Sequence, residues 1–235
     1  TLVLACAIDA ALAAPFAYIP NSGTDNVSVL DTATNSVVAT IPLPATSNPR
    51  GGTVTESRAY ITNGNGRSGS VIDTATNQVV ATVPVGDQPL GAVVDGTGTR
   101  LYVANISDDT VSVIDTATNQ VVQVIAVPGH PWGMAANGSG TRVYAANANT
   151  MSVSVIDTAL GYVTAVVPVG NVPRGLALNP SGTRLYVVDG TLSVVDTATN
   201  VVIRTIDVGI NGFGVAVDPT GSRIYVVNVC GSQLP

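Results

Sequence analysis

The stretch LYVANISDDTVSVIDTATNQVVQVIAV, residues 101–127, decides the fold because close copies of it recur along the chain. Its tyrosine belongs to a column with steps of 42 residues and a last step of 39. Aspartates and arginines form two further columns. The three columns are Tyr18, Tyr60, Tyr102, Tyr144, Tyr186 and Tyr225; Asp31, Asp73, Asp115, Asp157 and Asp196; and Arg58, Arg100, Arg142, Arg184 and Arg223. Self-similarity at a fixed period predicts repeated structural units.

Each repeat holds four short runs rich in Val, Ile, Thr and Tyr, the composition of half-buried strands. In the third repeat the runs are Gly91–Val94, Leu101–Ala104, Thr110–Ile114 and Gln120–Ala126, here called strands A, B, C and D. No segment shows a sustained helical period. The sequence therefore predicts an all-β chain.

The turns between these strands have their own chemistry. Asn179–Gly182 and Asp218–Gly221 place Pro second and Gly last, which is typical of a type I turn closing into a bulge between strands A and B. The turn between strands C and D reads DTATN in the first, second, third and fifth repeats. In the fourth repeat it reads DTALG and ends at Gly161. Asn and Gly are the residues that best tolerate a left-handed backbone, so we expect one at that position.

One four-stranded sheet of this size cannot bury both faces, but sheets repeated around an axis can bury one another. The pattern predicts a β-propeller of four-stranded blades, each about 42 residues long, with five complete blades and a partial sixth that ends after strand B at Asn228. A β-solenoid is the alternative, although its coils are usually shorter and lack two hairpin turns per repeat.

The repeat resembles that of the YVTN family, through Leu101–Asn105 followed by Thr110–Asn119, and the likeness extends from Ala17 onward. That family occurs in archaeal surface-layer proteins and in bacterial secreted or periplasmic proteins. Its fold is similar to the propellers of quinoprotein amine dehydrogenases. The resemblance implies a propeller and carries no shared catalytic motif.

The two ends leave alternatives open. We expect residues 17–235 to form a single propeller domain and residues 1–16 to be either a strand or a signal-peptide remnant. Ala5–Asp9 aligns with strand A of the other repeats, whereas Ala11–Ala13 resembles a cleavage site. Cys6 and Cys230 are either unpaired thiols or a disulfide that joins the ends.

The charge balance excludes some partners. Fifteen acidic residues face nine arginines and no lysine, a net charge of −6. Nucleic-acid binding needs clustered basic residues, so we expect no nucleic-acid partner. No apolar run is long enough to span a membrane. This acidic composition, rich in Thr, Asn and Val, favours an extracytoplasmic location: secreted, periplasmic or at the cell surface.

The residues that vary within the repeat are the candidates for binding. Hairpins A–B and C–D share one end of each blade, and loops B–C and D–A share the other. In the D–A loops two variable columns flank a recurring proline: Asn48, Gln88, His130, Val172 and Asn211 before it, and Arg50, Leu90, Trp132, Arg174 and Phe213 after it. Aromatic rings beside arginines suit a protein or carbohydrate partner. We therefore predict a ligand-binding site of Arg50, Gln88, His130, Trp132, Arg174 and Phe213; alternatively, Trp132 and Phe213 plug a central channel.

The constant Asp and Arg columns are interpreted as structural, with Asp accepting turn amides and Arg pairing with it. We expect the chain to act as a binding or structural scaffold, with self-association through an open blade edge as a further possibility. The alternative is a lyase or hydrolase that uses His130 as acid or base, with Asp87 as its partner. Asp87, Asp108 and Asp109 could also hold calcium, but no recognisable loop motif supports this, and we expect no metal and no cofactor.

Overall fold

The computed structural model describes residues 16–209 and 211–229. All regular secondary structure within these residues is β-strand. These residues divide into two compact units, which are described separately. Unit 1 comprises residues 16–94 and 98–124, and unit 2 comprises residues 95–97, 125–209 and 211–229. No helix in the described part of the chain has the length and hydropathy needed to cross a membrane.

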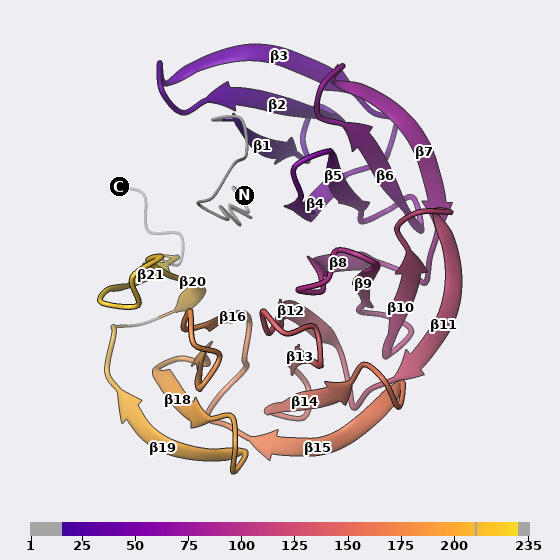
Figure 1. Ribbon diagram of the computed structural model, residues 1–235. Helices are drawn as coiled ribbons and strands as arrows, with labels where there is room; N and C mark the ends of the chain where they lie inside the picture. Colours follow the sequence, from indigo (N-terminus) through magenta and orange to yellow (C-terminus); the bar gives the residue numbers. More distant parts are fainter. Residues whose placement is uncertain (1–15, 210, 230–235) are drawn as a thin grey trace. The chain divides into compact units, whose positions relative to one another are not determined.

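Unit 1 contains three antiparallel sheets in which sequence neighbours pair (Figure 1). The first is three-stranded, and the next two are four-stranded. The strands are β1 (Phe16–Asn21), β2 (Asn26–Asp31) and β3 (Ser36–Pro42); β4 (Pro49–Val54), β5 (Arg58–Asn63), β6 (Ser68–Asp73) and β7 (Gln78–Pro84); and β8 (Pro89–Val94), β9 (Arg100–Asn105), β10 (Thr110–Asp115) and β11 (Gln120–Ala126), whose end passes into unit 2.

Unit 2 repeats the plan with two four-stranded sheets and one two-stranded sheet. The strands are β12 (Pro131–Ala136), β13 (Arg142–Asn147), β14 (Ser152–Asp157) and β15 (Tyr162–Pro168); β16 (Gly175–Leu178), β17 (Arg184–Val188), β18 (Leu192–Asp196) and β19 (Val201–Ile206); and β20 (Gly212–Val217) and β21 (Ile224–Asn228). The all-β prediction is confirmed, and the last sheet ends at Asn228 as predicted.

The predicted turn chemistry is also confirmed. The last residue of each C–D turn has a left-handed backbone: the φ angles are 54° at Asn35, 55° at Asn77, 56° at Asn119, 71° at Gly161 and 58° at Asn200. In the A–B turn of the fifth repeat, the Gly182 amide donates to the Asn179 carbonyl at 2.8 Å. Gly182 itself has φ of 68°, as a type I turn closing into a bulge requires.

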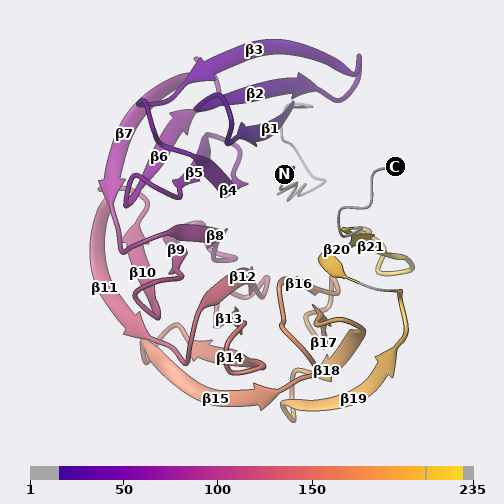
Figure 2. The same ribbon diagram turned by 180° about the vertical axis from the view of Figure 1, so that it is seen from behind.

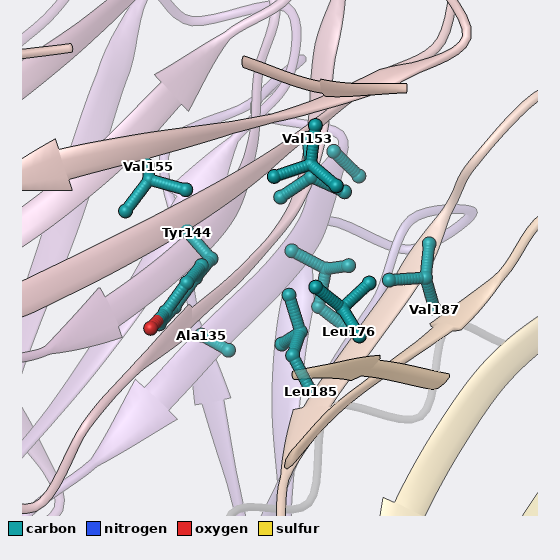
Figure 3. Close-up of a cluster of buried hydrophobic side chains, with 10 residues drawn as sticks. Ala135, Tyr144, Val153, Val155, Leu176, Leu185 and Val187 are labelled. Atoms are coloured by element: carbon teal, nitrogen blue, oxygen red, sulfur yellow. The ribbon is translucent and has the colours of Figure 1, made fainter. Parts of the chain in front are cut away.

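Side chains from several strands of one sheet pack on the next sheet of the same unit. In unit 2, Tyr144 of β13 and Val153 and Val155 of β14 belong to the same buried cluster as Leu176 and Leu185 of the following sheet (Figure 3). Burying a side chain of this kind contributes about 1.5–3 kcal/mol. Because no single sheet covers its own apolar faces, the core of each unit lies between sheets.

Glycines allow the first strands of neighbouring sheets to approach closely. In unit 2, β12 lies beside β16 and β16 beside β20 (Figure 2). A side chain at Gly133 would place its Cβ 2.1 Å from the Arg174 carbonyl oxygen, a distance that no real contact shows. Gly133 is therefore required by the neighbouring backbone.

Several expectations about the ends lie outside the described residues. They concern the strand expected at Ala5–Asp9, the signal-peptide alternative, and the pairing of Cys6 with Cys230. The single domain over residues 17–235 stays a prediction, as does the completeness of the first blade.

Candidate functional site

The first variable column of the D–A loops has a backbone role that the sequence analysis missed. Asn48, Gln88 and His130, each before a proline, and Asn211, before Gly212, all have left-handed φ angles, between 47° and 57°. Their carbonyl groups accept amide hydrogen bonds from residues that follow strand B of the same sheets, as between His130 and Ala148 at 3.0 Å. The signal was present in the residue types, since Asn and His are enriched in this conformation. Variation in this column is therefore limited by backbone geometry as well as by any ligand.

His130 contacts an amide side chain. Its Nδ1 atom lies 2.5 Å from Nδ2 of Asn149, in the B–C loop that follows β13. The proposed partner Asp87 belongs to unit 1 and lies 3.9 Å from Arg67.

Three of the predicted site residues meet in unit 2. Trp132 of β12 and Phe213 of β20 contact each other edge to face, with ring centroids 5.8 Å apart and planes at 72°. The Arg174 guanidinium, just before β16, lies 5.1 Å from the Trp132 centroid and 5.5 Å from that of Phe213. We call these three residues the Arg174 cluster. The cation–π attraction to both rings holds the guanidinium in place.

The charge of Arg174 has no acidic counterpart in the described part of the chain. Its Nε atom is buried and has no hydrogen-bond partner there. The side chain makes no ion pair with any described carboxylate. All three residues of the cluster are half-buried. The two aromatic rings pack on each other, as the plug alternative expects. Arg174 in the same cluster offers a cation without an acidic partner among the described residues, as a ligand-binding site expects.

The other two predicted residues meet in unit 1. Arg50 of β4 and Gln88, before β8, line a pocket of about 100 Å³, which we call the Arg50 pocket. Its remaining walls are Gly64, Asn65, Pro89, Leu90 and Ile106. The structure therefore assembles the six predicted residues as one pair, one trio and His130 beside Asn149.

The constant Asp and Arg columns lie at the opposite ends of the strands. The Asp115 carboxylate accepts the backbone amides of Ala117 and Thr118, both at 3.0 Å, and pairs with Arg100. These hydrogen bonds, first that of the Thr118 amide and then that of Arg100, lower the pKa of Asp115. The pKa values of Asp73 and Asp196 are also lowered, first by the backbone amides and then by the hydroxyls of Thr76 and Thr199, with smaller contributions from the paired Arg58 and Arg184.

The column is not uniform. Asp31 faces Phe16 across the β1–β2 pair, at the position where other repeats have arginine. Arg142 donates to the Thr197 carbonyl at 2.5 Å, a contact that joins two sheets of unit 2. Arg223 directs its backbone amide to the Asp218 carboxylate at 3.0 Å.

The candidate calcium ligands are engaged by other groups. Asp108 accepts the Asp87 amide at 2.7 Å, and its carboxylate lies 3.7 Å from Arg67. Residues 16–209 and 211–229 contain no group of three or more His, Cys, Asp or Glu side chains arranged to hold a metal ion.

Antiparallel four-stranded sheets in the order A–B–C–D, each packed on its neighbour within a unit, are the blades of a β-propeller. Comparison with solved structures supports this class. The chain is similar to a chain of hydrazine synthase from Kuenenia stuttgartiensis, with a TM-score of 0.74 and 28% identity over 77% of this chain and 56% of that chain. It thus spans just over half the length of that chain. The predicted propeller fold is confirmed.

A second similar structure is a functionally unknown protein from Desulfotomaculum acetoxidans DSM 771. The TM-score is 0.82 at 14% identity, over 91% of this chain and 72% of that chain. At this identity the likeness shows the fold alone. No protein-family model matches the chain, and no curated protein matches it either.

Proposed function

We propose that this propeller is an extracytoplasmic binding scaffold with YVTN-like repeats, and that the D–A and B–C loops engage a protein or carbohydrate partner. The observation that carries the proposal is the Arg174 cluster. The repeat keeps its frame constant but changes these three positions, and Arg174 lies over both aromatic rings. The frame of the repeat does not set the residue type at positions that differ between near-identical repeats. A specific contact with a partner therefore explains these residues better than the frame does.

The chemistry of the cluster indicates what the partner presents. An arginine fixed by aromatic rings loses little conformational freedom on binding, and its fork matches a carboxylate. The rings add apolar area at their edges. A partner with carboxylates, either an acidic peptide or an acidic oligosaccharide, suits these groups.

The experiment compares the wild-type chain with Arg174→Ala on arrays of acidic peptides and acidic oligosaccharides. We expect the wild type to retain a defined subset of probes and the variant to lose about ten-fold or more in affinity for it, as loss of a charged hydrogen bond implies. Arg204→Ala removes the same charge from exposed β19 and is the control. Equal retention by all three proteins, or no retained probe, would reject the proposal.

A second proposal is self-association through the edge of β21. Tyr225 is 56% exposed there, whereas its counterpart Tyr144 in β13 is 1% exposed. Val227 on the same strand is 54% exposed. In the four-stranded sheets a strand C pairs with the outer edge of strand B. Within residues 16–209 and 211–229 no strand pairs with that edge of β21, and an unpaired strand edge attracts another strand. A strand from a second copy of the chain supplies the missing cover.

Sedimentation velocity over a range of concentrations tests this second proposal. We expect the wild type to form dimers as concentration rises, and Val227→Lys to remain monomeric, because a charge on an edge strand blocks pairing. Val201→Lys, at an equally exposed valine on β19, serves as the control and should associate like the wild type. Association unchanged by Val227→Lys would contradict the proposal.

A further inference from the structure

The Arg50 pocket has the composition of a site for a small anion. It is lined by residues from two sheets of unit 1, among them the cationic residue Arg50, the amide residues Asn65 and Gln88, and the apolar residues Leu90 and Ile106. No carboxylate lines it. We propose that this pocket binds a small carboxylate with a short aliphatic tail.

The donors of the pocket are held in place by the surrounding loops. The Asn65 side-chain oxygen accepts a hydrogen bond from Asn48 Nδ2 at 3.2 Å, which leaves its own NH₂ group to donate. The Gln88 backbone is fixed in the left-handed region at φ of 49°, and its carbonyl accepts the Ile106 amide at 3.2 Å. The Gln88 side chain is exposed and able to turn toward a ligand.

Gly64 is the residue that makes room for the cation. A Cβ atom there would lie 2.8 Å from Arg50 Cγ and 3.3 Å from Arg50 Nε, so the arginine side chain lies across this glycine. The equivalent positions in the other B–C loops are Ser22, Ile106, Ala148 and Gly190. Glycine therefore occurs at this column in the two repeats whose D–A loops carry an arginine, Arg50 and Arg174. Arg50 makes no ion pair with any described carboxylate.

The nearby acidic groups are already engaged. Asp25 accepts the amides of Thr46 and Asn48, both at 2.7 Å. Asp87 accepts the Gln88 amide at 3.0 Å and lies 3.9 Å from Arg67. Their charges are directed to these partners and leave the Arg50 guanidinium to an external anion.

The size and the walls select the anion. A single water needs about 10–15 Å³ by this measure of cavity volume, so a pocket of about 100 Å³ accommodates a small anion that is larger than water. The planar fork of arginine pairs with both carboxylate oxygens. Leu90 and Ile106 would desolvate the outer oxygens of a tetrahedral sulfate but would favour an alkyl tail. Propionate has the predicted form.

The test is a titration of the ¹⁵N-labelled full chain with sodium propionate, followed by NMR at the side-chain amides of Asn65 and Gln88. Sodium sulfate at equal ionic strength is the reference anion. We expect saturable shifts with propionate only, and an affinity about ten-fold lower in Arg50→Gln. Gly64→Ala keeps the charge but displaces the arginine, and should also weaken binding. Arg204→Gln, the charge-matched control, should bind like the wild type.

Three results would overturn the inference: propionate shifts no different from those of sulfate, an Arg50→Gln variant with wild-type affinity, or an unchanged affinity in Gly64→Ala. Arg50 is exposed, so we expect its substitution to leave the fold intact, and the backbone spectrum verifies the fold of each variant. The inference concerns unit 1 alone. It holds even if the Arg174 cluster of unit 2 binds no partner.

Discussion

At the scale of the residue, the left-handed position that ends each C–D turn shows how one backbone angle constrains the side chain. Four repeats have Asn there and one has Gly161, and all five have positive φ. A residue with a Cβ atom meets its own carbonyl in this conformation, which Gly avoids and Asn tolerates. The substitution from Asn to Gly between repeats is therefore a conservative change.

We predict that Asn119→Ala lowers the free energy of unfolding by about 1 kcal/mol, because Ala pays the strain of a left-handed backbone. Asn119→Gly should remain within about 0.5 kcal/mol of the wild type, since the Asn119 side-chain oxygen has no hydrogen-bond partner to lose. Urea unfolding measures both values. Equal losses in the two variants would contradict a backbone origin.

The Asp column gives stability a dependence on pH. A carboxylate whose pKa is lower in the folded chain stabilises that state above its unfolded pKa, near 3.8, and this contribution is lost as pH falls toward the folded value. Asp115→Asn keeps an oxygen for the turn amides but cannot ionise. We therefore expect its urea midpoint to fall less between about pH 5 and about pH 3 than the wild-type midpoint.

The control is Asp109→Asn, which removes an exposed carboxylate of a B–C loop outside the Asp column. We expect the smaller fall of the urea midpoint to be specific to Asp115→Asn. If Asp115→Asn shows the wild-type drop between the two pH values, then the Arg100 pair and the turn hydrogen bonds do not contribute to acid stability.

At the scale of the element, the spacing between first strands depends on glycine. Gly133 of β12 and Gly214 of β20 occupy the same column of the repeat, but a Cβ atom at Gly133 would meet the Arg174 carbonyl oxygen, whereas one at Gly214 meets nothing within 4 Å. Gly133 is thus required, because the first strand of the next sheet of unit 2 lies against it. Gly214 is dispensable, because no described atom lies close to it.

Gly133→Ala should destabilise the chain by about 3 kcal/mol or prevent folding, because the opposing atom is backbone and cannot rotate away. Gly214→Ala should change stability by less than about 0.5 kcal/mol. Soluble yield and urea unfolding provide the two readouts. Similar stability of the two variants would show that β12 and β16 can separate at no cost.

At the scale of the whole molecule, stability arises between sheets. Leu185, which is fully buried, contacts side chains that belong to the preceding sheet of unit 2 (Figure 3). In repeat proteins each unit is stabilised mainly by its neighbours. Damage to one interface is therefore expected to affect the sheets on both sides of it.

We predict that Leu185→Ala costs about 2–5 kcal/mol, the range for a buried leucine that leaves a cavity. The sole tryptophan, Trp132, lies in the preceding sheet, so its fluorescence reports the loss directly. Val201→Ala at an exposed position should cost less than about 0.5 kcal/mol. An unfolding curve of Leu185→Ala that superimposes on the wild type would contradict a core shared between sheets.

The candidate site was predictable only in part. Variable columns around the D–A proline identified Arg50, Gln88, Trp132, Arg174 and Phe213, because repetition makes each exception visible. Sequence could not show that Gln88 has a left-handed backbone, or that the Arg50 side chain lies across Gly64, because both depend on contacts between separate loops.

The sequence by itself determined the repeat, the four strands of each blade and the chemistry of the turns, since these depend on residues close together along the chain. Tertiary structure alone decided which variable residues of the repeat come together. Arg174 lies over the rings of Trp132 and Phe213, and Arg50 lines a pocket with Gln88. The physical reason is that periodicity specifies the local backbone, whereas the partner of a side chain is set by how tightly adjacent sheets pack.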